Sequence, residues 1–150
     1  MYITLTRYYE SPEETKGELL VDGRPFGETR EPGTDYTTNT RGKRRLARIA
    51  EADYDCHITA SDLSPMSLKV KRRSGQGKVF FGWDAIASWR TGFICIGQAD
   101  PFEPPETREL TDREETFERF TQRLYQAYAR KETITLEVRR CLVNNLTNQL

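Results

Sequence analysis

A tight-turn signal at Asp22-Gly23 constrains the fold of this chain more than any other feature. Residues 17–21 before it and 24–30 after it have the composition of strands. An Asp-Gly pair suits the two-residue turn of an antiparallel hairpin, because glycine adopts positive φ without steric cost. Residues 2–9 alternate and are rich in β-branched and aromatic side chains, which is typical of a strand. The start of the chain therefore predicts antiparallel sheet, with residues 10–16 as a loop.

More short segments of strand character follow along the chain. They lie at residues 53–60, 66–73, 78–83 and 132–138. Closing such a sheet on itself removes exposed strand edges. The expected fold is mainly β (α+β): a small curled antiparallel sheet or barrel of seven to eight short strands. The expected organisation is one domain over residues 1–143, followed by a C-terminal tail at 144–150.

One amphipathic helix is predicted near the C-terminus. Apolar side chains recur there at spacings of three and four, as one buried helix face requires; they are Phe117, Phe120, Leu124, Ala127 and Tyr128. The preceding Thr111 and Glu114 fit a capping box, in which the threonine hydroxyl bonds forward and the glutamate reaches back. The helix is expected to cover one end or face of the sheet.

Composition excludes several classes of function. The 150 residues suit one domain, and 23 basic residues balance 23 acidic ones, so net charge gives no argument for nucleic-acid or membrane attraction. No run of about 18 apolar residues could span a membrane. The N-terminus lacks the basic start and apolar core of a signal peptide. The sequence therefore predicts a cytoplasmic protein without a membrane span.

The three cysteines do not indicate a metal or disulfide framework. Cys56, Cys95 and Cys141 are odd in number and widely spaced, and no Cys-x-x-Cys pair occurs. They are expected to be reduced and mostly buried, because a cysteine thiol packs as a small hydrophobe. We expect no metal site and no cofactor.

Two motifs carry a resemblance to a known family. Residues 17–31 follow the pattern Gly-x-Leu-x-x-Asp-Gly-x-x-Phe-x-x-Thr-x-Glu. Residues 92–97 read Gly-Phe-Ile-Cys-Ile-Gly, where the family has Gly-Cys-Ile-x-x-Gly, and residues 81–84 stand where it has Ile-His-x-Gly. With the order of the other segments, over about residues 3–138, this resembles a family of small, poorly characterised bacterial and phage proteins. That family looks distantly like the L,D-transpeptidases, cysteine enzymes that cross-link peptidoglycan.

The resemblance implies a degenerate member. Phe93 stands at the nucleophile position and Gly82 at the position of the histidine base, and neither can perform that chemistry. The leading hypothesis is therefore a non-catalytic binding or structural module of this transpeptidase-like, phage-associated type, with a protein as its partner. The predicted binding surface comprises Trp83, Asp84, Trp89, Arg90 and Phe93.

Two alternatives remain open from the sequence. In the first, the chain is a cysteine enzyme acting on peptidoglycan peptides, with Cys95 as nucleophile and His57, the sole histidine, as base. In the second, a basic loop at residues 41–48 binds nucleic-acid phosphates. The residues of that loop that would make the contacts are Arg41, Lys43, Arg44 and Arg45.

Overall fold

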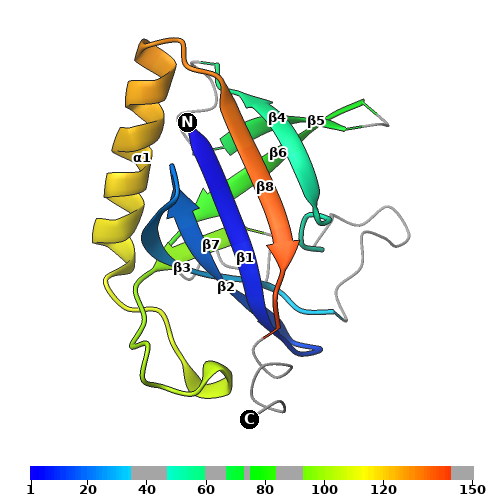
Figure 1. Cartoon of the computed structure of the whole chain (residues 1–150), viewed down its shortest axis with the longest axis vertical. Helices are drawn as coiled ribbons and strands as arrows, with labels where there is room; N and C mark the ends of the chain where they lie inside the picture. The colour runs from blue at the N-terminus through cyan, green and yellow to red at the C-terminus, as the bar shows by residue number, and fades with distance from the viewer. Residues whose placement is uncertain (35–46, 60–66, 73–74, 84–92, 143–150) are drawn as a thin grey trace.

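A computed structural model describes residues 1–34, 47–59, 67–72, 75–83 and 93–142 and shows a closed eight-stranded barrel with one helix (Figure 1). The elements in chain order are β1 (Tyr2–Glu10), β2 (Glu14–Val21), β3 (Arg24–Pro32), β4 (Ala52–His57), β5 (Ser67–Arg72), β6 (Gly75–Gly82), β7 (Ile94–Gly97), the 3-10 turn η3 (Pro105–Thr107), α1 (Arg113–Ala129) and β8 (Ile134–Arg140). The prediction of a mainly β barrel with a helix near the C-terminus is confirmed. Among the described residues, no helix is long and apolar enough to cross a membrane.

The strands follow one another around the barrel in the order β1-β2-β3-β7-β6-β5-β4-β8. Six neighbouring pairs are antiparallel, whereas β1 with β8 and β6 with β7 are parallel. The β1–β8 pair joins the two ends of the described chain and closes the barrel. The sequence did not indicate these parallel pairs, because strand direction depends on the path of the connections rather than on local composition.

The hairpin between β2 and β3 is confirmed. Asp22 and Gly23 both have positive φ, 52° and 80°, as a type I′ turn requires. The hairpin is longer than predicted, because Glu14 pairs with Pro32 and Lys16 pairs with Arg30. The prediction of a loop over residues 10–16 holds only for residues 11–13, because Glu10 ends β1 and residues 14–16 pair with β3 despite their polar composition.

Helix α1 lies against the barrel and contributes to its core. Phe120, Leu124 and Ala127 are fully buried, and the Phe120 ring centroid lies 4.9 Å from that of Phe81 on β6. Phe117 is partly buried against the same core. Tyr128 is 40% exposed, so its assignment to the apolar helix face was wrong. The face of α1 that the barrel covers is therefore narrower than the spacing of apolar residues predicted.

The predicted capping box does not form. Asp112 occupies the N-cap position with a φ of 46°, and no side chain caps the helix start. The Thr111 hydroxyl instead donates to the carbonyl oxygen of Gln98, at 3.4 Å. The backbones of these two residues also pair, so the tertiary contact removes Thr111 from the capping position.

A buried ion pair lies in the barrel wall, toward the C-terminal part of β1. Arg7 and Glu31 are each 1% exposed, and two hydrogen bonds of 3.0 and 2.8 Å join them side by side. Arg7 also donates to the carbonyl oxygen of Ile49, at 2.6 Å. Within the described segments, this pair connects β1, β3 and the chain that enters β4, which the sequence did not indicate.

Candidate functional site

The positions that resemble a transpeptidase-like reactive centre lie on β6 and β7. Gly82 pairs with Cys95 across these parallel strands. Phe93, just before β7, packs its ring 5.3 Å from that of Phe80. Phe93, which the resemblance aligns with a nucleophile, therefore takes part in an aromatic contact. Trp83 lies half-buried just after β6.

Cys95 and His57 are not brought together. Cys95 is 4% exposed on β7, whereas His57 is exposed on β4, with β5 and β6 between them. His57 pairs with Lys69 on β5, and Lys69 pairs with Lys78 on β6. Cys95 pairs with Gly82, which lies four residues beyond Lys78 on β6. Standard strand geometry converts this offset to about 13 Å along the strands and about 14 Å across them. A nucleophile and its base need to lie within about 3 Å of each other.

The other two cysteines occupy contrasting environments. The Cys56 thiol donates to the carbonyl oxygen of Tyr54, at 3.6 Å, and burial raises its pKa to about 12. Cys56 is therefore a protonated thiol at neutral pH and a poor nucleophile. Cys141 is exposed, so the expectation of mostly buried cysteines fails for this residue.

These environments predict selective thiol labelling. In the native protein, we expect iodoacetamide to modify Cys141 first, and Cys56 and Cys95 at least about tenfold more slowly, because burial limits access to both and the raised pKa of Cys56 suppresses its thiolate. Peptide mapping by mass spectrometry would follow each site, and unfolding in urea should equalise the three rates. Rapid native labelling of Cys95 would contradict this expectation and favour the cysteine-enzyme alternative.

The remaining residues singled out in the sequence lie outside the described residues. They are Arg41, Lys43, Arg44 and Arg45 of the basic loop, and Asp84, Trp89 and Arg90 of the aromatic surface. Over the described part of the chain, no group of three or more His, Cys, Asp and Glu side chains could hold a metal ion.

The connection between β7 and α1 is a compact loop. We name residues 98–111 the Phe102 loop; Figure 1 shows it projecting below the start of the helix. Its ends meet where Gln98 and Thr111 exchange two backbone hydrogen bonds of 2.7 Å. Gly97 permits this closure, because an added Cβ would lie 2.8 Å from the Thr111 carbonyl oxygen. A loop of this length with closed ends is an Ω-loop.

Two basic side chains hold the body of the Phe102 loop. Arg108 donates to the carbonyl oxygen of Pro101 at 3.2 Å, and to that of Glu103 at 2.8 and 3.1 Å. Lys16 on β2 is 6% exposed, and its Nζ lies 2.6–3.2 Å from three loop carbonyl oxygens, those of Pro105, Glu106 and Arg108. The loop is therefore fastened both internally and to the barrel.

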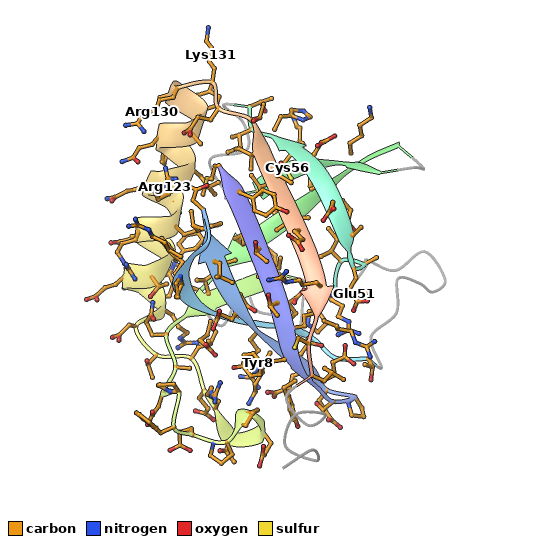
Figure 2. All side chains as sticks on the ribbon, viewed as in Figure 1. Tyr8, Glu51, Cys56, Arg123, Arg130 and Lys131 are labelled. Atoms are coloured by element: carbon orange, nitrogen blue, oxygen red, sulfur yellow. The ribbon has the colours of Figure 1, made fainter. Side chains whose placement is uncertain are left out.

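A polar cluster lies beneath the loop on the barrel wall. A bulge in β1 accommodates Tyr8, which Figure 2 shows beside this loop. The Tyr8 hydroxyl donates to Glu28 at 2.5 Å, and the Arg108 guanidinium lies over the Tyr8 ring, 5.1 Å from its centroid. Burial, followed by the bond to Glu28, raises the pKa of Tyr8 well above its usual value, so the hydroxyl keeps its proton. Burial also raises the pKa of Glu28, against the opposing effects of Tyr8 and Arg108.

The cleft at this cluster is too small for an organic ligand. Its volume is about 10 Å³, which corresponds to roughly one water molecule. Lys16, Arg30 and Arg108 border it, and each is engaged in an ion pair with a neighbouring glutamate. The cluster therefore acts as a support for the loop.

No family model, curated protein or solved structure matches this chain. Function therefore has to be inferred from its own residues.

Phe102, in the loop between β7 and α1, is the most exposed of the large hydrophobic residues that the structure describes. Its side chain is 94% exposed, whereas the other exposed large hydrophobic residues, Tyr2, Tyr125 and Tyr128, are 40–46% exposed. Asp100 fixes the local turn: its carboxylate accepts the Phe102 amide at 2.9 Å and its carbonyl oxygen accepts the Glu103 amide at 3.1 Å. The sequence signal that could have revealed this residue is an aromatic side chain within the acidic, proline-rich segment 100–106.

Proposed function

We propose that this protein is a non-catalytic binding module that docks a protein partner through the Phe102 loop. The observation that carries the proposal is the Phe102 side chain, which is 94% exposed on a loop with closed ends and a fastened body.

Rigidity distinguishes this residue from an ordinary exposed hydrophobe. Single apolar side chains on a protein surface are common and need no function. An aromatic side chain on a rigid backbone, however, can fill a partner's pocket without the entropic cost of ordering a loop during association. A few such anchors often supply most of the binding free energy at an interface. Lys16 and Arg108 provide this rigidity here.

The absence of catalysis is part of the same proposal. It is supported by the Phe93–Phe80 contact at the position where the family resemblance expects a nucleophile, and by the separation of Cys95 from His57. The resemblance to transpeptidase-like and phage-associated proteins stays a prediction, as does a contribution of Trp83 and Phe93 to binding. Nucleic-acid binding by the basic loop at 41–48 also stays a prediction.

Phe102→Ala tests the proposal directly. We expect this variant to bind its partner about 30-fold more weakly, because a buried aromatic anchor contributes about 2 kcal/mol. The wild-type chain would be affinity-purified from the cells that produce it, the co-purifying protein identified by mass spectrometry, and its affinity for both variants measured by titration.

Tyr125→Ala is the matched control, because Tyr125 is also an exposed aromatic residue but lies on α1, 46% exposed. It should retain the partner. The proposal fails if no protein depends on Phe102 for its recovery, or if both variants lose the same protein equally.

A further inference from the structure

Negative charge surrounds Phe102. Asp100, Glu103, Glu106 and Glu109 are all exposed in the same loop. The loop's sole basic residue is Arg108, so its formal charge is −4 + 1 = −3. The Arg108 side chain is 15% exposed and turned toward Tyr8 and Glu28. The exposed charges of the Phe102 loop are therefore predominantly negative, although the whole chain has no net charge.

These carboxylates differ from many others in the molecule in having no cationic partner. Over the described residues, ion pairs engage Glu10, Glu14, Asp22, Glu28, Glu31, Glu51, Glu132 and Glu137. Within the same residues, none engages a carboxylate of the Phe102 loop. Asp53 and Asp55 on β4 also lack an ion pair among the described residues, so the Phe102 loop is distinguished by placing four exposed carboxylates in the same short segment as an exposed aromatic ring.

A structural reason for acidic residues exists nearby but does not extend to the loop. Glu114 and Glu115 lie in the first turn of α1, where negative charge interacts favourably with the helix dipole. Glu103, Glu106 and Glu109 precede that helix and have no such role.

We propose that the partner is a protein that presents lysine and arginine side chains around an apolar pocket, and that this pocket accepts Phe102. The inference rests on the proposed function and specifies the chemistry of the partner. Opposite charges at the rim steer association and select the partner, whereas the central aromatic residue supplies most of the affinity. Nucleic acid does not fit this surface, because its phosphates would meet the four carboxylates.

Photo-crosslinking at position 102 tests this inference. The full chain with p-benzoylphenylalanine in place of Phe102 would be irradiated in the cells that produce it, and the crosslinked site would be sequenced by mass spectrometry. The same chain would then carry the charge reversals Glu103→Lys and Glu106→Lys. We expect about a tenfold loss of crosslink, and a crosslinked site flanked by lysine or arginine. In a purified complex, about 0.5 M NaCl should also lower the affinity of the chain without charge reversals for its partner.

Asp53→Lys with Asp55→Lys is the matched control, because both aspartates are exposed on β4, outside the loop. This double variant should crosslink as strongly as the unreversed chain. If reversal at 103 and 106 leaves the crosslink unchanged, or if the crosslinked site is acidic, the inference about charge is wrong while the proposed function stands. If no polypeptide crosslinks at position 102, or only nucleic acid does, both are wrong.

Discussion

Glu31→Ala is expected to lower the free energy of unfolding by about 3–5 kcal/mol, because it removes the buried carboxylate that binds the Arg7 guanidinium through two hydrogen bonds. The remaining partner, the exposed Glu51 carboxylate at 3.7 Å, is a weaker substitute. Arg7 and Glu31 are each 1% exposed, so solvent screens the remaining Arg7 charge poorly. Domains of this size unfold with about 5–15 kcal/mol, so the loss is a large share of the total. Urea denaturation followed by tryptophan fluorescence would measure it.

Two further variants compare the buried ion pair with an exposed ion pair and with an apolar replacement. Arg139→Ala removes the exposed ion pair with Glu137, in which Arg139 is 56% exposed, and should cost less than about 1 kcal/mol. The double variant Arg7→Met with Glu31→Leu should recover most of the loss, because a packed apolar pair does not leave a buried charge. Equal losses for Glu31→Ala and Arg139→Ala would show that the buried pair is not a special contributor.

Phe120→Ala is expected to destabilise the protein by about 3–5 kcal/mol, as removal of a buried aromatic side chain does in other cores. Phe120 is fully buried and contacts Phe81, at 4.9 Å, and Phe26, at 5.8 Å between ring centroids. It therefore fastens α1 to both β6 and β3. Thermal or urea unfolding monitored by circular dichroism at 222 nm would report the loss.

Phe102→Ala provides the same chemical change at an exposed position. Its effect on stability should stay within about 0.5 kcal/mol, because the side chain is 94% exposed. The two phenylalanines thus separate stability from binding: Phe120 should affect folding, and Phe102 should affect only the partner. A large stability loss in Phe102→Ala would contradict the exposed placement of this residue.

Local features of the sequence predicted several elements because short-range interactions determine them. The Asp22-Gly23 turn follows from the φ preference of glycine. The helix at 113–129 follows from its three-and-four spacing, which placed Phe120 and Leu124 correctly in the core. The predicted strand at residues 66–73 coincides with β5, where Leu68 and Val70 are both buried. The capping box failed because Thr111 pairs with Gln98, and the prediction for Tyr128 failed because the covered face of the helix is narrower than the apolar pattern.

The sequence did not predict the candidate site at the Phe102 loop. Phe102 is hydrophobic, and its composition alone cannot distinguish a side chain that packs inside from one that a loop holds outside. Its display depends on Lys16, whose Nζ reaches the carbonyl oxygen of Arg108 92 positions away. The order of the motifs instead predicted a binding surface at residues 83–93, of which the structure describes only Trp83 and Phe93.

The sequence by itself determined that this chain forms short strands, one tight hairpin and one amphipathic helix, because these depend on neighbouring residues. Tertiary structure alone decided that β1 pairs in parallel with β8, that Arg7 meets Glu31, and that Lys16 fastens the Phe102 loop. Each of these contacts joins segments that are distant in the chain and leaves no periodic signal in either one. The physical reason is that strand pairing and the packing of the loop on the barrel, rather than local propensity, bring these groups together.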